Sequence, residues 1–329
     1  MAGRRTTTDG ARRVGVIGLG TMGGAMAANL VKAGFAVSGC DPVGAARAAL
    51  RRAGGTPLRD AVEVARSSAF LILSLPSVAA LEAVCADLAR AGVRGIVAAE
   101  TGTLPIEAKL AARDALARSG ITLLDCPLSG TGAQARTGDL SVYASGDARA
   151  IRAMTPVFEG FARSHFDLGA FGNGMRMKLV ANLLVAIHNV SAAEAILMGV
   201  RSGLDATTVL KVIGDGAGSS RMFQVRGPMM VERSWDKATM TMALWQKDMR
   251  LIQEALLATQ TPAPLFAATV PLYSAALAQG LANDDTGAVY AVLERLASAP
   301  ERTAAAPRTR ARNTGAKSAT PRRSRRSGS

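Results

Sequence analysis

Cysteine, histidine and aromatic residues are scarce in this chain of 329 residues. It has three cysteines and two histidines, and aromatic residues make up 4% of it. The cysteines, Cys40, Cys85 and Cys126, lie in separate segments without a paired spacing. This pattern argues against a disulfide framework and a zinc site, and it fits a reducing compartment such as the cytoplasm. His165 and His188 have no ligand-like spacing either, so we expect no bound metal.

Long apolar runs and a secretory leader are also missing. No uninterrupted apolar run approaches the length of a membrane span, so no membrane partner is expected. The first 13 residues are basic and lack the apolar core of a secretory signal. With 49% hydrophobic and 19% charged residues, the composition is typical of a globular protein large enough for two domains.

Positive charge is concentrated at the two ends of the chain. The formal net charge is +14, and residues 301–329 alone carry nine basic residues against one acidic residue. Residues 1–13 and 300–329 have no apolar period, so both segments are predicted to be disordered. A basic tail can contact nucleic acid electrostatically, but without an aromatic platform or a helix-turn-helix we expect only non-specific contact.

The chain is organised around a glycine motif near its N-terminus. The apolar run 14–17 leads into Gly18-Leu19-Gly20-Thr21-Met22-Gly23 and then into a helical pattern that ends near Gly34. A strand that passes through such a turn into a helix is typical of dinucleotide-binding sites. Gly18 allows the sharp turn, Gly20 lets the backbone approach a pyrophosphate, and Gly23 lets the helix pack closely on the strand. A turn that binds nothing is the alternative.

An acidic residue follows the motif near the position expected for ribose binding. The apolar segment 35–40 ends in Asp41, whose carboxylate can accept hydrogen bonds from both ribose hydroxyls. It would repel a 2′-phosphate, and Pro42 separates it from the next basic residue, Arg47. NAD is therefore predicted as the preferred cofactor, with NADP as the alternative.

Strands and helices alternate through the first half of the chain. Strands are predicted at 14–17, 35–40, 69–75, 95–99, 121–125 and 140–145. Helices are predicted at 44–53, near 60, and at 77–89, 105–118 and 148–161. This alternation predicts an α/β fold, a mostly parallel sheet with helices on both faces, and the strand 140–145 completes that layer.

Three of these strands end in unusual sequence, at Leu75-Pro76, 100–105 and 125–133. Ligands of open α/β sheets bind beyond the carboxyl ends of strands, so these segments and the glycine motif would surround one crevice. Ser129 offers a hydroxyl there, and the small Gly130 and Gly132 leave backbone N–H groups open to a carboxylate.

Beyond residue 172 the pattern becomes helical, which indicates a second domain. One long helix is predicted over 175–201, and shorter ones are predicted at 205–213, 219–231, 238–259, 264–279 and 286–297. Lys178 and Asn182 lie one turn apart in the long helix, among apolar residues. Desolvation there would move the pKa of Lys178 toward that of a general acid/base. A lysine that snorkels to solvent is the alternative.

Four motifs in this order resemble those of the β-hydroxyacid dehydrogenases, typified by 3-hydroxyisobutyrate dehydrogenase. They are Gly18-Leu19-Gly20-Thr21-Met22-Gly23, Asp125-Cys126-Pro127-Leu128-Ser129-Gly130, the spacing of Gly172, Gly174, Lys178 and Asn182, and Lys247-Asp248. The resemblance covers residues 14–297. It implies an NAD-binding Rossmann domain over 14–172, then an all-helical substrate and dimerisation domain over 173–299, in a homodimer or homotetramer.

The resemblance also implies roles for particular residues. Lys178 matches the catalytic lysine and Asn182 the amide that holds the substrate. The substrate carboxylate would bind the loop of Ser129, Gly130 and Thr131. The cofactor would bind the glycine motif, Asp41, Leu75, Pro76, Thr103 and Lys247.

The chain departs from the family pattern at several positions. Glu100-Thr101-Gly102-Thr103 stands where the family has Asp-x-Ser-Thr, and Thr131 stands where it has the second glycine of Ser-Gly-Gly. Ala181 stands where many members have Asn or His, which argues against the 6-phosphogluconate dehydrogenase branch. These changes leave the substrate open.

The implied reaction is hydride transfer between a nicotinamide cofactor and a small hydroxy acid or semialdehyde, with Lys178 as the general acid/base. Candidate substrates include 3-hydroxyisobutyrate, tartronate semialdehyde, succinic semialdehyde, glyoxylate and threonate. Two alternatives stay open. One is an imine reductase-like enzyme, whose relatives generally lack the lysine, and the other is a non-catalytic NAD-binding protein with a nucleic-acid-binding tail.

Overall fold

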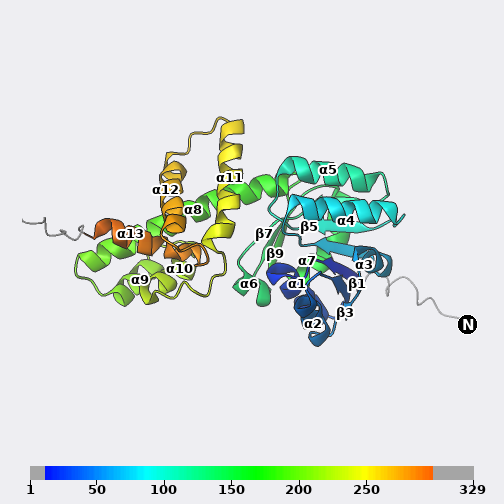
Figure 1. Cartoon of the computed structure of the whole chain (residues 1–329), viewed down its shortest axis with the longest axis horizontal. Helices are drawn as coiled ribbons and strands as arrows, with labels where there is room; N and C mark the ends of the chain where they lie inside the picture. The colour runs from blue at the N-terminus through cyan, green and yellow to red at the C-terminus, as the bar shows by residue number, and fades with distance from the viewer. Residues whose placement is uncertain (1–11, 299–329) are drawn as a thin grey trace, which may run out of the picture.

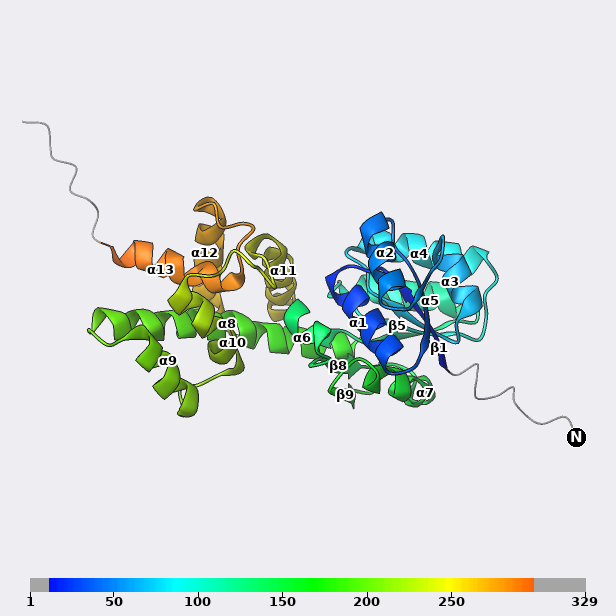
Figure 2. The same cartoon turned by 90° about the horizontal axis from the view of Figure 1, so that it is seen from below.

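The computed structural model of the chain describes residues 12–298, which form two domains joined by a long helix (Figures 1 and 2). The N-terminal domain holds the sheets and the C-terminal domain is helical, so the predicted fold class is confirmed. The predicted disordered tail at 300–329 lies outside the described residues, as does the predicted N-terminal segment up to Ala11.

A six-stranded parallel sheet forms the centre of the N-terminal domain. Its strands are β1 (Arg13–Ile17), β2 (Ala36–Cys40), β3 (Thr56–Pro57), β4 (Phe70–Leu73), β5 (Val97–Glu100) and β6 (Thr122–Asp125). Their order is β3-β2-β1-β4-β5-β6, and all neighbouring pairs are parallel. The order changes direction between β1 and β4, and ligands of such sheets bind beyond that point.

Helices cover both faces of this sheet, because its side chains alternate between two hydrophobic clusters. Val14 and Val16 of β1 pack in one cluster with Phe158, and Ile17 packs in the other with Leu71. The helices of this domain are α1 (Thr21–Lys32), α2 (Gly44–Arg52), α3 (Ala61–Ser67), α4 (Val78–Arg90), α5 (Ile106–Ala117), α6 (Gly132–Arg136) and α7 (Ala148–Glu159).

The prediction that a strand at 140–145 completes the main layer is wrong. β8 (Ser141–Ala144) lies in a separate three-stranded sheet, between β7 (Leu128–Ser129) and β9 (Ser164–Asp167). It pairs antiparallel with β7 and parallel with β9. Pro127 has no N–H to continue a ladder beyond β6, and the chain leaves the main sheet there.

The long helix α8 (Asn173–Arg201) runs from the second sheet through the helical domain (Figure 2). The other helices are α9 (Ala206–Asp215), α10 (Arg221–Glu232), α11 (Met242–Ala258), α12 (Pro264–Ala278) and α13 (Val289–Ala297). All of them contact α8. By length and composition α8 could cross a membrane, but that is weak evidence for a helix around which a domain packs.

Two segments of the helical domain become helical later than predicted. α11 begins at Met242, because Thr241 is extended and its side chain caps the helix, while the backbone N–H groups of Thr239 and Met240 donate to the buried Asp285. The predicted helix 286–297 opens with a 3-10 turn before α13, and Asp285 caps that turn as well. One buried carboxylate therefore shapes both segments.

A buried ion network ties α8 to the parallel sheet. Lys109 Nζ on α5 lies 2.7 Å from Glu100 Oε2 and 2.7 Å from Asp125 Oδ1, at the ends of β5 and β6. Asp125 Oδ2 accepts the backbone N–H of Met175, in the first turn of α8, at 2.8 Å. All three charged side chains are fully buried. Burial alone would lower the pKa of Lys109, but the two carboxylates raise it, so the lysine stays charged.

Replacing Lys109 with Met should destabilise the fold strongly, because two buried carboxylates would lose their cation. We expect the free energy of unfolding to fall by about 3–5 kcal/mol in urea titrations. Arg90→Met is the matched control, since Arg90 pairs with Asp87 at the surface and its loss should cost less than ~1 kcal/mol. Equal losses in the two variants would contradict the structural role of Lys109.

Candidate active site

A cavity of about 1840 Å³ lies between the two domains and is lined by residues from both. It extends from the glycine turn before α1 to side chains of α8, α10 and α11. Among the residues predicted for the site, those that line it are Gly18, Gly20, Thr21, Met22, Asp41, Leu75, Pro76, Thr103, Ser129, Gly130, Thr131, Lys178, Asn182 and Lys247. Leu19 and Gly23 are buried and do not line it.

The glycine turn has the shape that a dinucleotide needs. Gly18 has φ +90°, and a Cβ there would lie 2.2 Å from the backbone oxygen of Ser74. A Cβ on Gly23 would lie 1.9 Å from the backbone oxygen of Gly18, so close helix packing requires glycine. Gly20 has open space around it and caps α1 without a side chain. The first N–H groups of α1 are thus left for an anion such as a pyrophosphate.

Asp41 lies at the end of β2, beside this turn. Its Oδ2 accepts the backbone N–H of Leu19 at 2.7 Å, and its Oδ1 accepts that of Val43 at 2.8 Å. Arg47 also lines the cavity and donates to the backbone oxygens of Asp41 and Pro42. A carboxylate therefore stands where a ribose would bind, with a basic side chain closer to it than the sequence suggested.

Lys178 and Asn182 share the cavity-facing side of α8. Lys178 is partly buried and Asn182 is almost fully buried. Burial lowers the pKa of Lys178 to about 8, while Asp248 acts in the opposite direction and Lys247 in the same one. A lysine of this kind exchanges its proton near neutral pH, which a general acid/base requires.

Asp248 on α11 was not assigned a role from the sequence, although its motif was noticed. Its Oδ2 accepts from Asn182 Nδ2 at 2.9 Å, and its Oδ1 lies 2.9 Å from Lys247 Nζ. Lys247 in turn donates to the backbone oxygen of Thr103 across the cavity. These contacts orient the Asn182 amide and keep the charge of Asp248 partnered, so Lys178 receives no direct ion pair from it.

Some hydrogen-bonding groups of the loop predicted to bind a carboxylate are already paired with groups of α6. Thr131 caps α6, and its backbone N–H donates to Gln134 Oε1 at 3.0 Å. Gly130 has φ +133°, and a Cβ there would meet Leu140 at 2.6 Å. Ser129 remains at the cavity wall. The loop thus offers fewer free donors than its sequence suggests.

Two of the strand-end carboxylates do not reach the cavity. Glu100 and Asp125 are fully buried against Lys109, and they hold the start of α8 rather than a ligand. The sequence did not predict this structural role, because it does not reveal that Lys109 lies between the carboxyl ends of β5 and β6.

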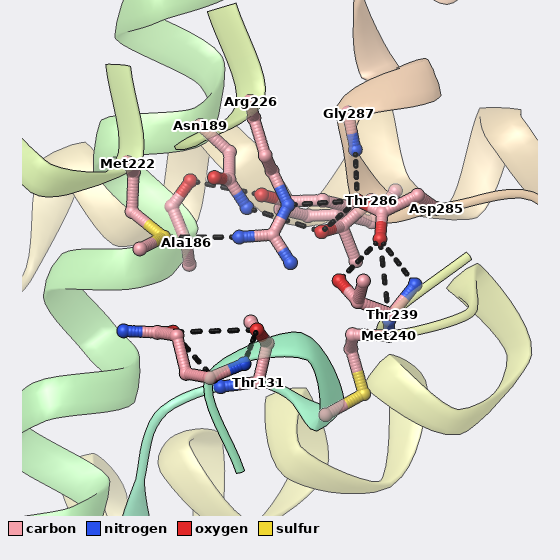
Figure 3. A network of polar contacts seen from close by, with 12 residues as sticks. Thr131, Ala186, Asn189, Met222, Arg226, Thr239, Met240, Asp285, Thr286 and Gly287 are labelled. Atoms are coloured by element: carbon pink, nitrogen blue, oxygen red, sulfur yellow. Dashed lines mark hydrogen bonds and ion pairs between the residues drawn. The ribbon is translucent and has the colours of Figure 1, made fainter. Parts of the chain in front are cut away.

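Arg226 on α10 was missed by the sequence analysis. It is 3% exposed and lines the cavity, and its Nε lies 2.8 Å from Asp285 Oδ1 (Figure 3). The available signal was its helical spacing from Phe223 and Met230, which places a charge on the buried face of α10.

Two family models together match almost the whole described chain. One describes the NAD-binding domain of 6-phosphogluconate dehydrogenase and matches residues 13–198. The other describes the NAD-binding domain of NADP-dependent 3-hydroxyisobutyrate dehydrogenase and matches residues 172–293. The chain belongs to the β-hydroxyacid dehydrogenase family. It is therefore related to NAD(P)-dependent oxidoreductases, as its motifs predict.

Individual members of the β-hydroxyacid dehydrogenase family resemble the chain over most of its length. An L-threonate dehydrogenase of Cupriavidus necator is 30% identical, covering 85% of this chain and 96% of the relative. An NAD-dependent L-serine dehydrogenase of Pseudomonas aeruginosa is 30% identical, covering 87% and 97%. The structure of Mycobacterium tuberculosis 3-hydroxyisobutyrate dehydrogenase with L-serine has a TM-score of 0.76 at 27% identity, covering 86% and 99%.

Proposed function

We propose that this enzyme transfers hydride between a nicotinamide cofactor and a small hydroxy acid or its oxo or semialdehyde partner. The observation that carries the proposal is Lys178, a partly buried lysine with a lowered pKa, one turn from Asn182 in the interdomain cavity. The names of the relatives, which include L-threonate and L-serine dehydrogenases, support a small hydroxy acid as substrate. An imine reductase-like activity is less favoured, because imine reductase-like relatives generally lack the lysine that is present here as Lys178.

Some residues of the cavity would bind the cofactor, and others would act on the substrate. A bound nicotinamide would accept or supply the hydride, and the glycine turn, Asp41, Leu75 and Pro76 would hold the cofactor. In oxidation Lys178, as the neutral amine, takes the proton of the substrate hydroxyl. In reduction its ammonium gives a proton to the carbonyl oxygen. Asn182, held by Asp248, orients that oxygen through its remaining N–H.

The finer assignments belong to the same proposal. We infer a preference for NAD over NADP from the Asp41 carboxylate, a homodimer or homotetramer from the family pattern, and a cytoplasmic location from the three free cysteines. The basic tail is assigned no specific nucleic-acid partner.

Loss of Lys178 should nearly silence the enzyme while leaving cofactor binding intact. We expect Lys178→Ala to lower kcat by at least ~10² in assays of NADH absorbance with a panel of hydroxy acids and oxo acids. Lys178→Arg should not restore activity, because a guanidinium does not release its proton at accessible pH. NADH fluorescence titrations of the same variants provide the control. Near-normal turnover in Lys178→Ala would make the lysine a structural residue and refute the proposed mechanism.

The pH dependence should have opposite signs in the two directions. Oxidation needs the neutral amine, so kcat/KM should rise with pH and level off above about 8, the pKa of Lys178. Reduction needs the ammonium, so kcat/KM should fall above the same value. Profiles of the free enzyme in both directions test this, and matching slopes in the two directions would exclude Lys178 as the titrating group.

Cofactor preference should depend on Asp41. We expect the wild type to have higher kcat/KM with NAD, and Asp41→Asn with Pro42→Arg to shift the ratio toward NADP, because a carboxylate is removed and a cation added near the 2′ position. Kinetics with both cofactors measure the ratio. Equal or better wild-type efficiency with NADP would overturn the assignment, and the nearby Arg47 would then be the first residue to replace.

A further inference from the structure

Arg226 is a buried cation whose Nη2 nitrogen has no hydrogen-bond partner among the described residues. Its Nε pairs with Asp285 at 2.8 Å, and its Nη1 lies 3.0 Å from Met222 Sδ. Within residues 12–298, no group accepts a hydrogen bond from Nη2. Figure 3 shows the guanidinium held between Asp285 and Met222, with the remaining nitrogen turned toward Thr131. Arg226 lines the cavity, so Nη2 is a charged donor available there, and it suits a ligand with an oxygen acceptor.

The anchor of this guanidinium is itself fixed in place. Asp285 Oδ2 accepts from the backbone N–H and the hydroxyl of Thr239, and its Oδ1 accepts from the backbone N–H of Gly287. Burial alone would raise the pKa of Asp285, but Arg226 and these donors hold it below its ordinary value, so the carboxylate stays charged. Its oxygens are saturated with donors, and the free edge of Arg226 is preorganised toward the cavity.

The other basic side chains that line the cavity are either paired with other protein groups or exposed to solvent. Lys247 contacts Asp248 and Thr103, and the exposed Arg163 and Arg221 both pair with Asp139. The further exposed ones are Arg59, Arg136 and Lys237, and Arg47 donates to the backbone beside Asp41. Lys178 is the proton-transfer residue of the proposed mechanism. Arg226 is thus the buried cation of this cavity that has unpaired N–H groups, those of Nη2.

We propose that Arg226 binds the carboxylate of the substrate through Nη2 and so selects acids over neutral alcohols. The loop of Ser129, Gly130 and Thr131 faces the same cavity, but the backbone N–H of Thr131 already donates to Gln134 Oε1. Arg226 supplies the charge-assisted donor that this loop lacks. Asp285, the partner of Arg226, precedes Thr286, whose hydroxyl accepts from Asn189 Nδ2 at 3.4 Å, so Arg226 lies beyond Asn182 along α8. The inference rests on the proposed function, and it requires a substrate with its reacting oxygen at Lys178 and its carboxylate further along α8.

The test measures binding rather than turnover, so it does not require a known substrate. Malonate is the probe and malonamide its neutral counterpart, each titrated calorimetrically into the full chain with NAD present. We expect malonate to bind more tightly than malonamide, and Arg226→Gln and Arg226→Lys to weaken malonate by at least ~10-fold and remove the difference. Arg226→Lys keeps a cation for Asp285, so it serves if Arg226→Gln does not fold.

Matched controls separate a binding role from a structural one. Arg233→Gln removes an arginine that pairs with Glu294 at the surface, outside the cavity, and malonate affinity should stay unchanged. NAD affinity of the Arg226 variants should remain close to wild type. The melting temperature of Arg226→Gln should fall, because the buried Asp285 loses its cation, and that of Arg226→Lys should fall less. Folded Arg226 variants with normal malonate affinity would overturn the inference, and so would a loss of NAD affinity, which would assign Arg226 to the cofactor. Arg226-dependent malonate binding without turnover of any hydroxy acid would refute the proposed function alone.

Discussion

The carboxylate of Asp125 joins the parallel sheet to the helix that carries Lys178. One oxygen pairs with Lys109, and the other accepts the N–H of Met175 at the start of α8. A helix is stiff over several turns, so fixing its first turn also fixes where Lys178 and Asn182 point. This junction thus fixes the start of α8 against the sheet that also carries the glycine turn.

Three wholly or partly buried cations, Lys109, Arg226 and Lys178, differ in how many carboxylates they contact. Lys109 has two, and its pKa is raised above the ordinary value. Arg226 has one, Asp285, and keeps a free arm in the cavity. Among residues 12–298, no carboxylate pairs directly with Lys178, and burial lowers its pKa to about 8. Basic side chains thus give a structural anchor at Lys109, the anion-binding donor that we propose at Arg226 and the proton-transfer group that we propose at Lys178, according to the local charge balance.

Besides pairing with Arg226, Asp285 holds a backbone segment of the helical domain. It accepts the backbone N–H groups of Thr239 and Met240 and so holds the segment that leads to Thr241, the cap of α11. The start of α11 determines which of its side chains reach the cavity, including Asp248, which holds the Asn182 amide. The orientation of the amide beside Lys178 therefore depends on a carboxylate that lies outside the cavity lining.

Local patterns were sufficient to predict the alternating strands and helices, the glycine turn and the one-turn spacing of Lys178 and Asn182, because period and backbone conformation are encoded within a few residues. The sheet that β8 joins and the role of Arg226 depended on the tertiary structure. Asp125 and Met175 are 50 residues apart and Arg226 and Asp285 are 59 apart, yet each pair is in direct contact. Such pairings arise only when separate elements pack together, so no local period in the sequence reveals them.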